Sequence, residues 1–309
     1  MQQITNTLLM VRPVAFRMNG ETAVNNYFQR QVHLENAQIN KKAQMEFDAM
    51  VAKLGSVGVN VIVVRDDPTT DTPDSIFPNN WVSFHPNGTV GLYPMFAENR
   101  RSERRGEIFD RIEREGFNIE HFMDYTPAEE DGLFLEGTGS LSLDRVNKKA
   151  YCALSPRANE TLFIEFCEDF EYFPVVFTAN QTVNGKRLPV YHTNVMMCLA
   201  EAFCIICLEA IDDKKERTNV VGHLNEDGKE IIAITEAQMH CFAGNMLQVQ
   251  GRGHKYAVMS QAAHDSLAQA QLRAIKKHGP VLSSPLHTIE TCGGGSARCM
   301  MAEVFLPKN

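Results

Sequence analysis

The stretch Cys292-Gly293-Gly294-Gly295-Ser296-Ala297-Arg298-Cys299-Met300-Met301 places three consecutive glycines just before a cysteine that opens an apolar run. Because glycine lacks a Cβ, the backbone there can lie close to a neighbouring group. A thiol beside Arg298 and exposed amide groups is expected to have a pKa lowered toward the reactive thiolate. We therefore interpret Cys299 as a candidate nucleophile at the start of a strand. A small core residue is the alternative, and it is the interpretation we favour for Cys292.

The same design, a small or polar turn before an apolar strand, recurs along the whole chain. Consecutive turns are 51 to 59 residues apart. This spacing predicts five repeats of strand, helix, strand and turn. A closed ring of such units would bring all five turns to one end of a central channel, where a site could form. The alternative is an ordinary α/β chain with similar spacing. The turn residues are Asn80, Gly139, Asn194, Asn245 and Cys299.

Apolar periodicity and stop signals predict the helices, and β-branched or apolar runs predict the strands. Gly55 is expected to end the first helix. The predicted helices cover about 41–54, 100–115, 159–170 and 261–278, and the predicted strands include 7–13, 59–64, 81–84, 117–119, 140–143, 175–177, 195–198, 246–249, 281–282 and 300–305.

The composition is that of an ordinary globular protein, with 309 residues of which 44% are hydrophobic and 22% charged. A net charge of −8 argues against nucleic acid as a partner. The N-terminus has no signal-peptide pattern, and no apolar run reaches the length of a membrane span. We expect one cytoplasmic catalytic domain over residues 1–309, which could form a homodimer. Eight scattered cysteines, including the apolar Cys204-Ile205-Ile206-Cys207, predict no metal site.

The predicted turns carry polar residues suited to catalysis. His192 can move protons at neutral pH, although a hydrogen-bonded histidine at a strand edge is the alternative. Glu136 follows an apolar run and should have a partner. Asp74, Asn79 and Asn80 belong to the first turn, where local capping is an alternative for either asparagine. Arg157 follows the second unit. It is either a charged residue on the surface or a residue that binds a carboxylate through two hydrogen bonds.

Five segments resemble, in order, motifs of the pentein superfamily, which includes arginine deiminases, dimethylarginine dimethylaminohydrolases and amidinotransferases. The superfamily has a Pro-Asp-x-x-Phe stretch, an acidic-Gly-Gly-Asp turn, a Ser-x-Arg-Thr-Asn stretch, a His-Leu-Asp turn and a glycine-rich approach to a catalytic cysteine. The corresponding segments here are Pro73-Asp74-Ser75-Ile76-Phe77-Pro78-Asn79-Asn80-Trp81, Leu135-Glu136-Gly137-Thr138-Gly139, Ser155-Pro156-Arg157-Ala158-Asn159, His192-Thr193-Asn194 and Gly293 to Cys299.

The resemblance covers nearly the whole chain and implies a five-bladed α/β propeller that binds a small amino-acid substrate without metal or organic cofactor. It implies that Cys299 is the nucleophile, that His192 is the acid and base, and that Glu136 lies beside the reacting carbon. It further implies that Arg157 binds a substrate carboxylate and that Arg100 or Arg101 is a second clamp. The implied substrate-binding residues are therefore Asp74, Asn79, Asn80, Arg100, Arg157 and Asn194.

The chain departs from the superfamily pattern where deiminases carry carboxylates. Asn79 or Asn80 stands in the first turn, Asn194 follows His192, and Thr138-Gly139 replaces Gly-Asp. A guanidinium offers only donors and needs acceptor carboxylates, whereas a ureido group also presents a carbonyl oxygen. We therefore expect citrulline hydrolysis to ornithine, ammonia and carbon dioxide, and the sequence is most similar to bacterial citrulline hydrolases. Arginine or dimethylarginine hydrolysis, amidino transfer and a non-enzymatic binding propeller are the alternatives.

Overall fold

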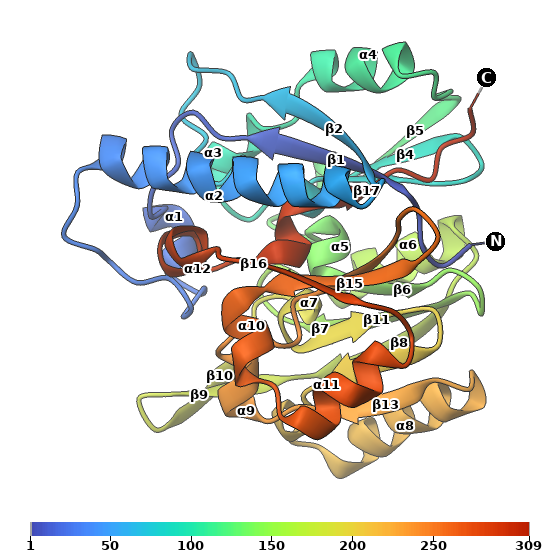
Figure 1. Cartoon of the computed structure of the whole chain (residues 1–309). Helices are drawn as coiled ribbons and strands as arrows, with labels where there is room; N and C mark the ends of the chain where they lie inside the picture. Colours follow the sequence, from blue (N-terminus) through green and yellow to red (C-terminus); the bar gives the residue numbers. More distant parts are fainter. Residues whose placement is uncertain (1, 309) are drawn as a thin grey trace.

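The computed structural model describes residues 2–308 and contains five three-stranded sheets of one topology (Figure 1). In each sheet the middle strand pairs antiparallel with one neighbour and parallel with the other. The sheets are β17(Ala302–Glu303)-β1(Thr7–Arg12)-β2(Asn60–Arg65), β3(Val82–Phe84)-β4(Thr89–Leu92)-β5(His121–Asp124), β6(Leu141–Asp144)-β7(Lys149–Leu154)-β8(Phe173–Thr178), β11(Met197–Leu199)-β12(Phe203–Ile206)-β13(Glu230–Ala233) and β14(Leu247–Gln250)-β15(Lys255–Ser260)-β16(Val281–Ser284).

Each parallel pair needs a crossover, and helices lie in every one of these connections. The mixed α/β fold and the five strand–helix–strand repeats are therefore confirmed, whereas closure into a propeller stays a prediction. The crossover elements are α1(Gly20–Ala23) and α2(Asn36–Ser56), α3(Glu98–Arg101) and α4(Gly106–Arg114), α6(Glu160–Asp169), η3(Leu208–Ala210) and α8(Lys214–Glu226), and α10(Gln261–Ser266) and α11(Gln269–Lys276).

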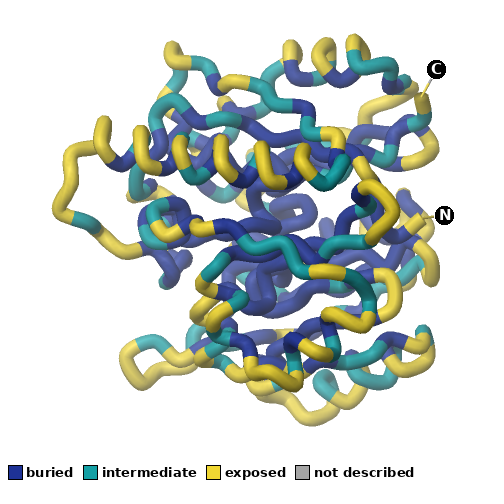
Figure 2. Tube along the Cα trace, viewed as in Figure 1, coloured by how far each residue is buried: buried dark blue, intermediate teal, exposed yellow. Residues whose placement is uncertain are grey.

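A short helical turn precedes the first strand of four sheets, and these turns meet in the interior. η1 packs against α5 and η4, and α5 packs against α7. The centre of the chain trace is buried, while the long helices expose their outer faces (Figure 2). The four turns are η1(Pro78–Asn80), α5(Gly137–Ser140), α7(Thr193–Met196) and η4(Ala297–Met300), and the remaining elements are η2(Thr126–Glu129), the hairpin β9(Asn180–Val183)-β10(Lys186–Pro189), α9(Glu236–Met239) and α12(His287–Gly293).

Several predicted helix boundaries are wrong because of the backbone conformation at single residues. The first helix continues past Gly55 to Ser56, and Gly58, at φ +87°, makes the left-handed turn instead. The helix expected over 100–115 is two helices, because the backbone of Arg105 is extended at the N-cap of α4. The helix expected over 261–278 breaks at Leu267, which is extended and buried.

The two remaining corrections concern strands. The strand expected at 117–119 begins only at His121, because Phe117 turns into the core and forms an isolated bridge to Lys308. The final strand is restricted to Ala302–Glu303, and Cys299 lies in η4 before it.

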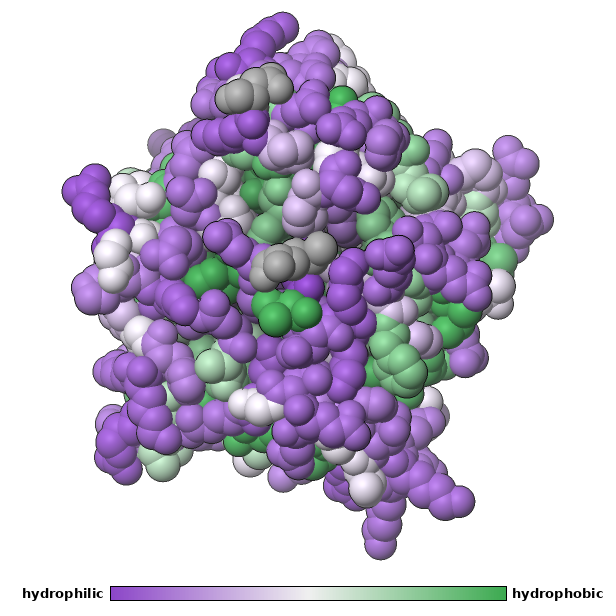
Figure 3. Space-filling view, turned by 90° about the vertical axis from the view of Figure 1, so that its right-hand side faces the viewer, coloured by the Kyte–Doolittle hydropathy of each residue, from purple (hydrophilic) through white to green (hydrophobic). Residues whose placement is uncertain are grey.

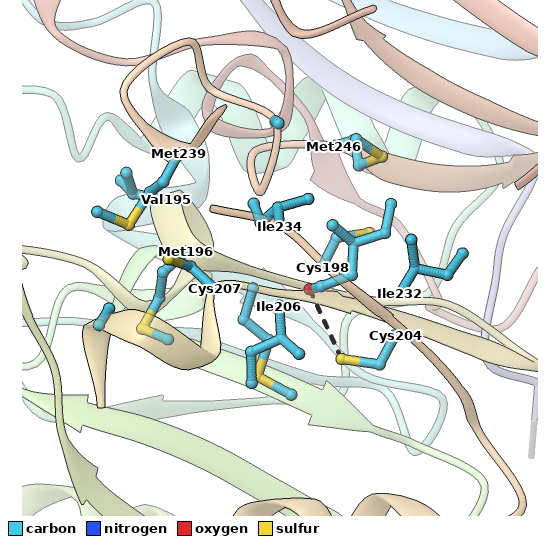
Figure 4. Packing of buried hydrophobic residues seen from close by; sticks show 14 of the residues in the cluster. Val195, Met196, Cys198, Cys204, Ile206, Cys207, Ile232, Ile234, Met239 and Met246 are labelled. Atoms are coloured by element: carbon cyan, nitrogen blue, oxygen red, sulfur yellow. Dashed lines mark hydrogen bonds between the residues drawn. The ribbon is translucent and has the colours of Figure 1, made fainter. Parts of the chain in front are cut away.

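Apolar packing holds the turns in place. One large cluster spans the sheet β11-β12-β13 and includes Val195 and Met196 from α7 and Met246 from the turn at Asn245, just before β14 (Figure 4). Close packing of this kind fixes the backbone from which the turn side chains project. No helix within residues 2–308 is both long and apolar enough to cross a membrane.

Candidate active site

One narrow cavity collects six of the residues that the sequence singled out. Asp74, Asn80, Arg100, Arg157, His192 and Cys299 line it, together with Asn26, Phe77, Tyr191, Gly293 and Gly295. The three other predicted residues, Glu136, Asn79 and Asn194, are buried directly behind this lining. About 10 Å³ of the cavity is open to the centre of a water-sized sphere, which is roughly the room for one water molecule. An amino-acid substrate therefore requires the cavity to widen.

The thiol of Cys299 is surrounded by amide groups. Nδ2 of Asn245 lies 3.3 Å from the sulfur, and Nδ2 of Asn194 lies 3.6 Å from it. The side chain is only 2% exposed, and burial raises its pKa above the ordinary value against the smaller opposing effects of these donors. The expected lowering of this pKa is therefore wrong. The guanidinium of Arg298 is directed instead to Met301 O and to Glu303.

His192 and Glu136 form a buried pair beside the cavity. Nε2 of His192 lies 2.7 Å from Oε2 of Glu136. An ionised carboxylate can only accept, so Nε2 carries the hydrogen and Nδ1 is the free basic nitrogen. Burial lowers the pKa of His192 to about 4, although the hydrogen bond with Glu136 opposes this. The imidazole is therefore neutral at neutral pH.

Glu136 uses both of its oxygens within the protein. Oε1 accepts from the backbone N–H of Phe96 at 3.0 Å, and Oε2 lies 3.5 Å from Arg157 and 3.9 Å from Arg100. Burial acts to raise the pKa of this carboxyl, but the charge of Arg157, the His192 hydrogen bond and Arg100 together lower it to about 2. Glu136 is therefore a fixed negative charge that orients His192.

Because Gly139 has no side chain, the turn at Asn80, the turn at Gly139 and the ring of His192 can pack closely together. A Cβ at this position would lie 2.5 Å from Nδ2 of Asn80 and 2.8 Å from the ring of His192. The preceding Gly137, at φ +43°, packs equally closely on the carbonyl oxygen of Asn79. The Leu135-Glu136-Gly137-Thr138-Gly139 turn thus needs both glycines to pack against Asn79, Asn80 and His192.

Arg100, rather than Arg101, belongs to the cavity. Arg100 is 2% exposed, forms a bidentate pair with Glu103 and donates to Oδ1 of Asn80 at 2.8 Å. Arg101 is partly exposed and pairs with Glu129. Asn79 bonds to Thr138 and to Asn80, so the two asparagines form a fixed amide pair in the wall.

Arg157 lines the cavity, but most of its donors already have partners. Its Nε and Nη2 donate to Oδ1 of Asn25, and Nη2 also donates to the carbonyl oxygen of Thr22. The guanidinium also lies 5.0 Å above the ring of Tyr191. Only a rearrangement of this N-terminal segment would free Arg157 to bind a substrate carboxylate in full.

Asp74 keeps one carboxylate oxygen available. Its Oδ2 accepts from Asn19 and Thr22, whereas Oδ1 is buried and has no hydrogen-bond partner within residues 2–308. Since a buried carboxylate oxygen ordinarily has a donor, Oδ1 is suited to an N–H group of a ligand.

Two parts of the site were not identified from the sequence. Asn245 donates to both Cys299 and the carbonyl oxygen of Asn194, and the repeat spacing that placed it in the fourth turn could have revealed it. The segment around α1, with Asn19, Thr22, Asn25 and Asn26, closes one wall of the site and carries no recognisable motif.

Comparisons with known proteins give a family match and similar structures. Residues 12–306 match the family model for N,N dimethylarginine dimethylhydrolase, eukaryotic. No curated protein matches the sequence. ArgZ, an arginine dihydrolase from the ornithine-ammonia cycle in cyanobacteria, has a TM-score of 0.75 and 17% identity over 98% of this chain and 41% of its own. AgrE in its ternary complex with ornithine and NAD+ has a TM-score of 0.74 and 18% identity over 98% of this chain and 40% of its own.

A third structure is similar over nearly its entire length. The dimethylarginine dimethylaminohydrolase adduct with S-methyl-L-thiocitrulline has a TM-score of 0.62 and 14% identity over 97% of this chain and 99% of its own. The present chain therefore spans about two fifths of ArgZ and AgrE but nearly all of this protein. At these identities the likeness is one of fold.

Proposed function

Since the chain belongs to the N,N-dimethylarginine dimethylhydrolase family and hence to the pentein superfamily of guanidino-modifying enzymes, we propose that it is a cysteine hydrolase whose best-matched substrate is citrulline. Cys299 is the nucleophile, His192 transfers protons, and Glu136 orients His192. The five sheets are the blades of a single catalytic domain with the site at its centre.

The observation that carries the choice of substrate is the set of groups around the sulfur. Asn245 and Asn194 approach Cys299 with amide nitrogens, and Asn80, elsewhere in the wall, donates to Asn79. Amide N–H groups can stabilise negative charge that develops on a ureido oxygen. A guanidinium has no acceptor for them, and burying it without enough carboxylates costs several kcal/mol.

The first half of the reaction forms a carbamoyl thioester. The sulfur of Cys299 bonds to the ureido carbon while its proton moves to Nδ1 of His192, the nitrogen that Glu136 leaves free. The bond from that carbon to the side-chain nitrogen then breaks. This nitrogen takes the proton from His192, and ornithine leaves.

The second half releases the enzyme. Water gives a proton to His192 and adds to the carbamoyl carbon, the carbon–sulfur bond breaks, and Cys299 recovers the proton. The carbamic acid that leaves decomposes to ammonia and carbon dioxide. Because the resting thiol and imidazole are both neutral, the proton transfer accompanies the attack rather than preceding it. The N-terminal domain of ArgZ has been observed covalently bound to a reaction intermediate, which supports this type of chemistry.

Hydrolysis of arginine or dimethylarginine is the second candidate, and Asp74 favours it. The unpartnered Oδ1 of Asp74 could accept from a guanidinium as well as from a ureido N–H group. Asp74→Asn separates the two substrates. A cationic substrate would lose its buried counter-ion, whereas a neutral one would lose only a hydrogen bond.

The direct test is a parallel assay of citrulline, arginine, N,N-dimethylarginine and agmatine, with ammonia and ornithine measured in each reaction. We expect ornithine and ammonia from citrulline, and no turnover by Cys299→Ser. Rapid conversion of arginine to citrulline, with citrulline itself unchanged, would refute the substrate assignment and leave the cysteine chemistry intact.

A further inference from the structure

Outside the catalytic cavity, Arg145 is a buried cation that has no counter-ion among residues 2–308. Arg145 follows β6 and is 2% exposed. Its guanidinium stacks on the ring of Phe305 at 4.1 Å, and Nη1 is buried without a hydrogen-bond partner among residues 2–308. Within the same residues, no carboxylate oxygen lies within ion-pair distance of it. Buried charges are ordinarily paired, because an isolated one is costly.

The neighbouring carboxylates are already used. Asp144 pairs with Lys229 at 2.9 Å, and Glu303 pairs with Arg298 at 2.7 Å. These two ion pairs are each balanced, so Arg145 leaves the cluster with one excess positive charge. The nearby hydroxyl of Tyr172 does not supply the missing negative charge, because burial raises its pKa even though Arg145 acts in the opposite direction.

The excess charge faces a cavity. Arg145 lines it together with Ser142, Arg298 and Glu303, and Cys198 and Met246 contribute apolar wall (both labelled in Figure 4). The hydroxyl of Ser142 makes no hydrogen bond to another described side chain or to the backbone, so it is a second available donor. Gln3 belongs to the same wall. The face of the molecule that Figure 3 shows is largely hydrophilic.

The size of the cavity restricts the ligand. About 30 Å³ is open to the centre of a water-sized sphere, whereas one water molecule needs about 10–15 Å³ by this measure. A ligand of a few heavy atoms fits, and an amino acid or a nucleotide does not. We propose that this cavity, which Arg298 also lines, binds a small inorganic anion, chloride or bicarbonate, through Arg145 and Ser142.

The site would lie immediately behind the nucleophile. Arg298 precedes Cys299 in η4, and its backbone N–H donates to Oδ1 of Asn245, whose amide also contacts the sulfur. An anion bound beside Arg298 therefore stabilises the wall from which η4 presents Cys299. This role is independent of which substrate the enzyme hydrolyses.

Thermal unfolding tests the proposal without any activity measurement. Chloride and bicarbonate are titrated in separate series at constant ionic strength, with gluconate, which is too large for the cavity, as the balancing anion. We expect the Tm of the unaltered protein to rise and saturate with at least one small anion, since a ligand of the folded state stabilises it by mass action. Arg145→Gln should abolish the rise, and in gluconate it should be at least as stable as the unaltered protein.

Arg187→Gln is the matched control, because Arg187 is an exposed arginine in ion pairs with Asp212 and Glu236 on the surface, and this variant should keep the anion response. Equal anion responses in the unaltered protein and in Arg145→Gln would overturn the proposal. If Arg145→Gln fails to fold, crystals of the unaltered protein grown in bromide decide the matter. An anomalous peak from bromide, or electron density for bicarbonate in crystals grown with that anion, is expected at hydrogen-bond distance from Arg145, and the absence of both would rule the site out.

Discussion

Nε2 of His192 donates to Oε2 of Glu136 at 2.7 Å, although 56 positions separate the two residues in the chain. The same carboxylate is the buried counter-charge of Arg157 and Arg100. This one carboxylate thus orients His192 and balances Arg157, while Arg100 pairs more closely with Glu103, and substitutions at Glu136 and His192 separate these two roles.

Glu136→Gln should lose both roles, whereas His192→Gln should lose only catalysis. Removing the carboxylate leaves the buried guanidinium of Arg157 without its counter-charge, whereas Arg100 keeps its pair with Glu103, so we expect a loss of about 3–5 kcal/mol in the free energy of unfolding. His192→Gln should lower kcat about 10²–10⁴-fold with a much smaller loss of stability. Urea unfolding and initial rates of both variants check this, and equal stabilities would contradict the proposed role of Glu136.

Gly139→Ala should disturb the site without unfolding the protein. The new Cβ would lie within 3 Å of both Asn80 and His192, so the imidazole must shift. We expect kcat to fall by about 10²-fold, in line with a displacement of roughly 1 Å. Gly106→Ala is the control, because nothing lies within 4 Å of its added Cβ. Unchanged kcat in Gly139→Ala would show that the close approach is not needed.

Activity should persist at a lower pH than an ordinary histidine allows. His192 must be neutral to accept the thiol proton, and burial lowers its pKa to about 4. We therefore expect kcat/KM to stay level through pH 6.5 and to decrease only as the pH falls toward 4. The measurement is kcat/KM against pH, with unfolding monitored at each point. An acid limb near pH 6.5 would contradict this environment for His192.

Alkylation of Cys299 should be slow at neutral pH. Burial raises the pKa of the thiol, so the reactive thiolate is scarce below its ordinary titration range. The rate of iodoacetamide labelling at this residue should keep increasing up to at least pH 9. Peptide mass spectrometry measures this labelling rate. A rate that already reaches its plateau below pH 7 would indicate a resting thiolate instead.

Asn194→Asp should shift substrate preference toward a guanidinium. This change places a carboxylate beside the sulfur, where the amide nitrogen of Asn194 now lies 3.6 Å away. The carboxylate repels developing negative charge on a ureido oxygen and attracts a cation. We expect citrulline turnover to fall by about 10²–10³-fold and the ratio of arginine to citrulline turnover to rise. A proportional loss with both substrates would argue against Asn194 as a determinant of specificity.

The repeat made most of the site predictable. Because every unit ends in a turn at the same edge of its sheet, aligning Asn80, Gly139, Asn194, Asn245 and Cys299 anticipated which segments meet. The choice of Arg100 over Arg101 was not predictable, because neighbouring helix residues point in different directions and only packing selects the buried one.

The remaining features depend on contacts that sequence spacing does not encode. The pKa of Cys299 was misjudged chiefly because the tertiary structure buries the thiol, which raises its pKa, and because the Arg298 guanidinium is directed to Glu303 and not to the sulfur. Asn25 bonds to Arg157 across 132 positions, from a segment without periodicity or motif. Such long-range polar pairing becomes visible only in three dimensions.

The most direct test of the central claim is mass spectrometry of the enzyme quenched during turnover of citrulline. The proposed mechanism predicts a carbamoyl group on the peptide that contains Cys299. Because His192 activates the water that removes this group, the adduct should accumulate in His192→Gln. It should be absent in Cys299→Ser. An amidino group formed from arginine would instead support the guanidine hydrolase. An unmodified Cys299 under conditions of full turnover would contradict covalent catalysis by this residue.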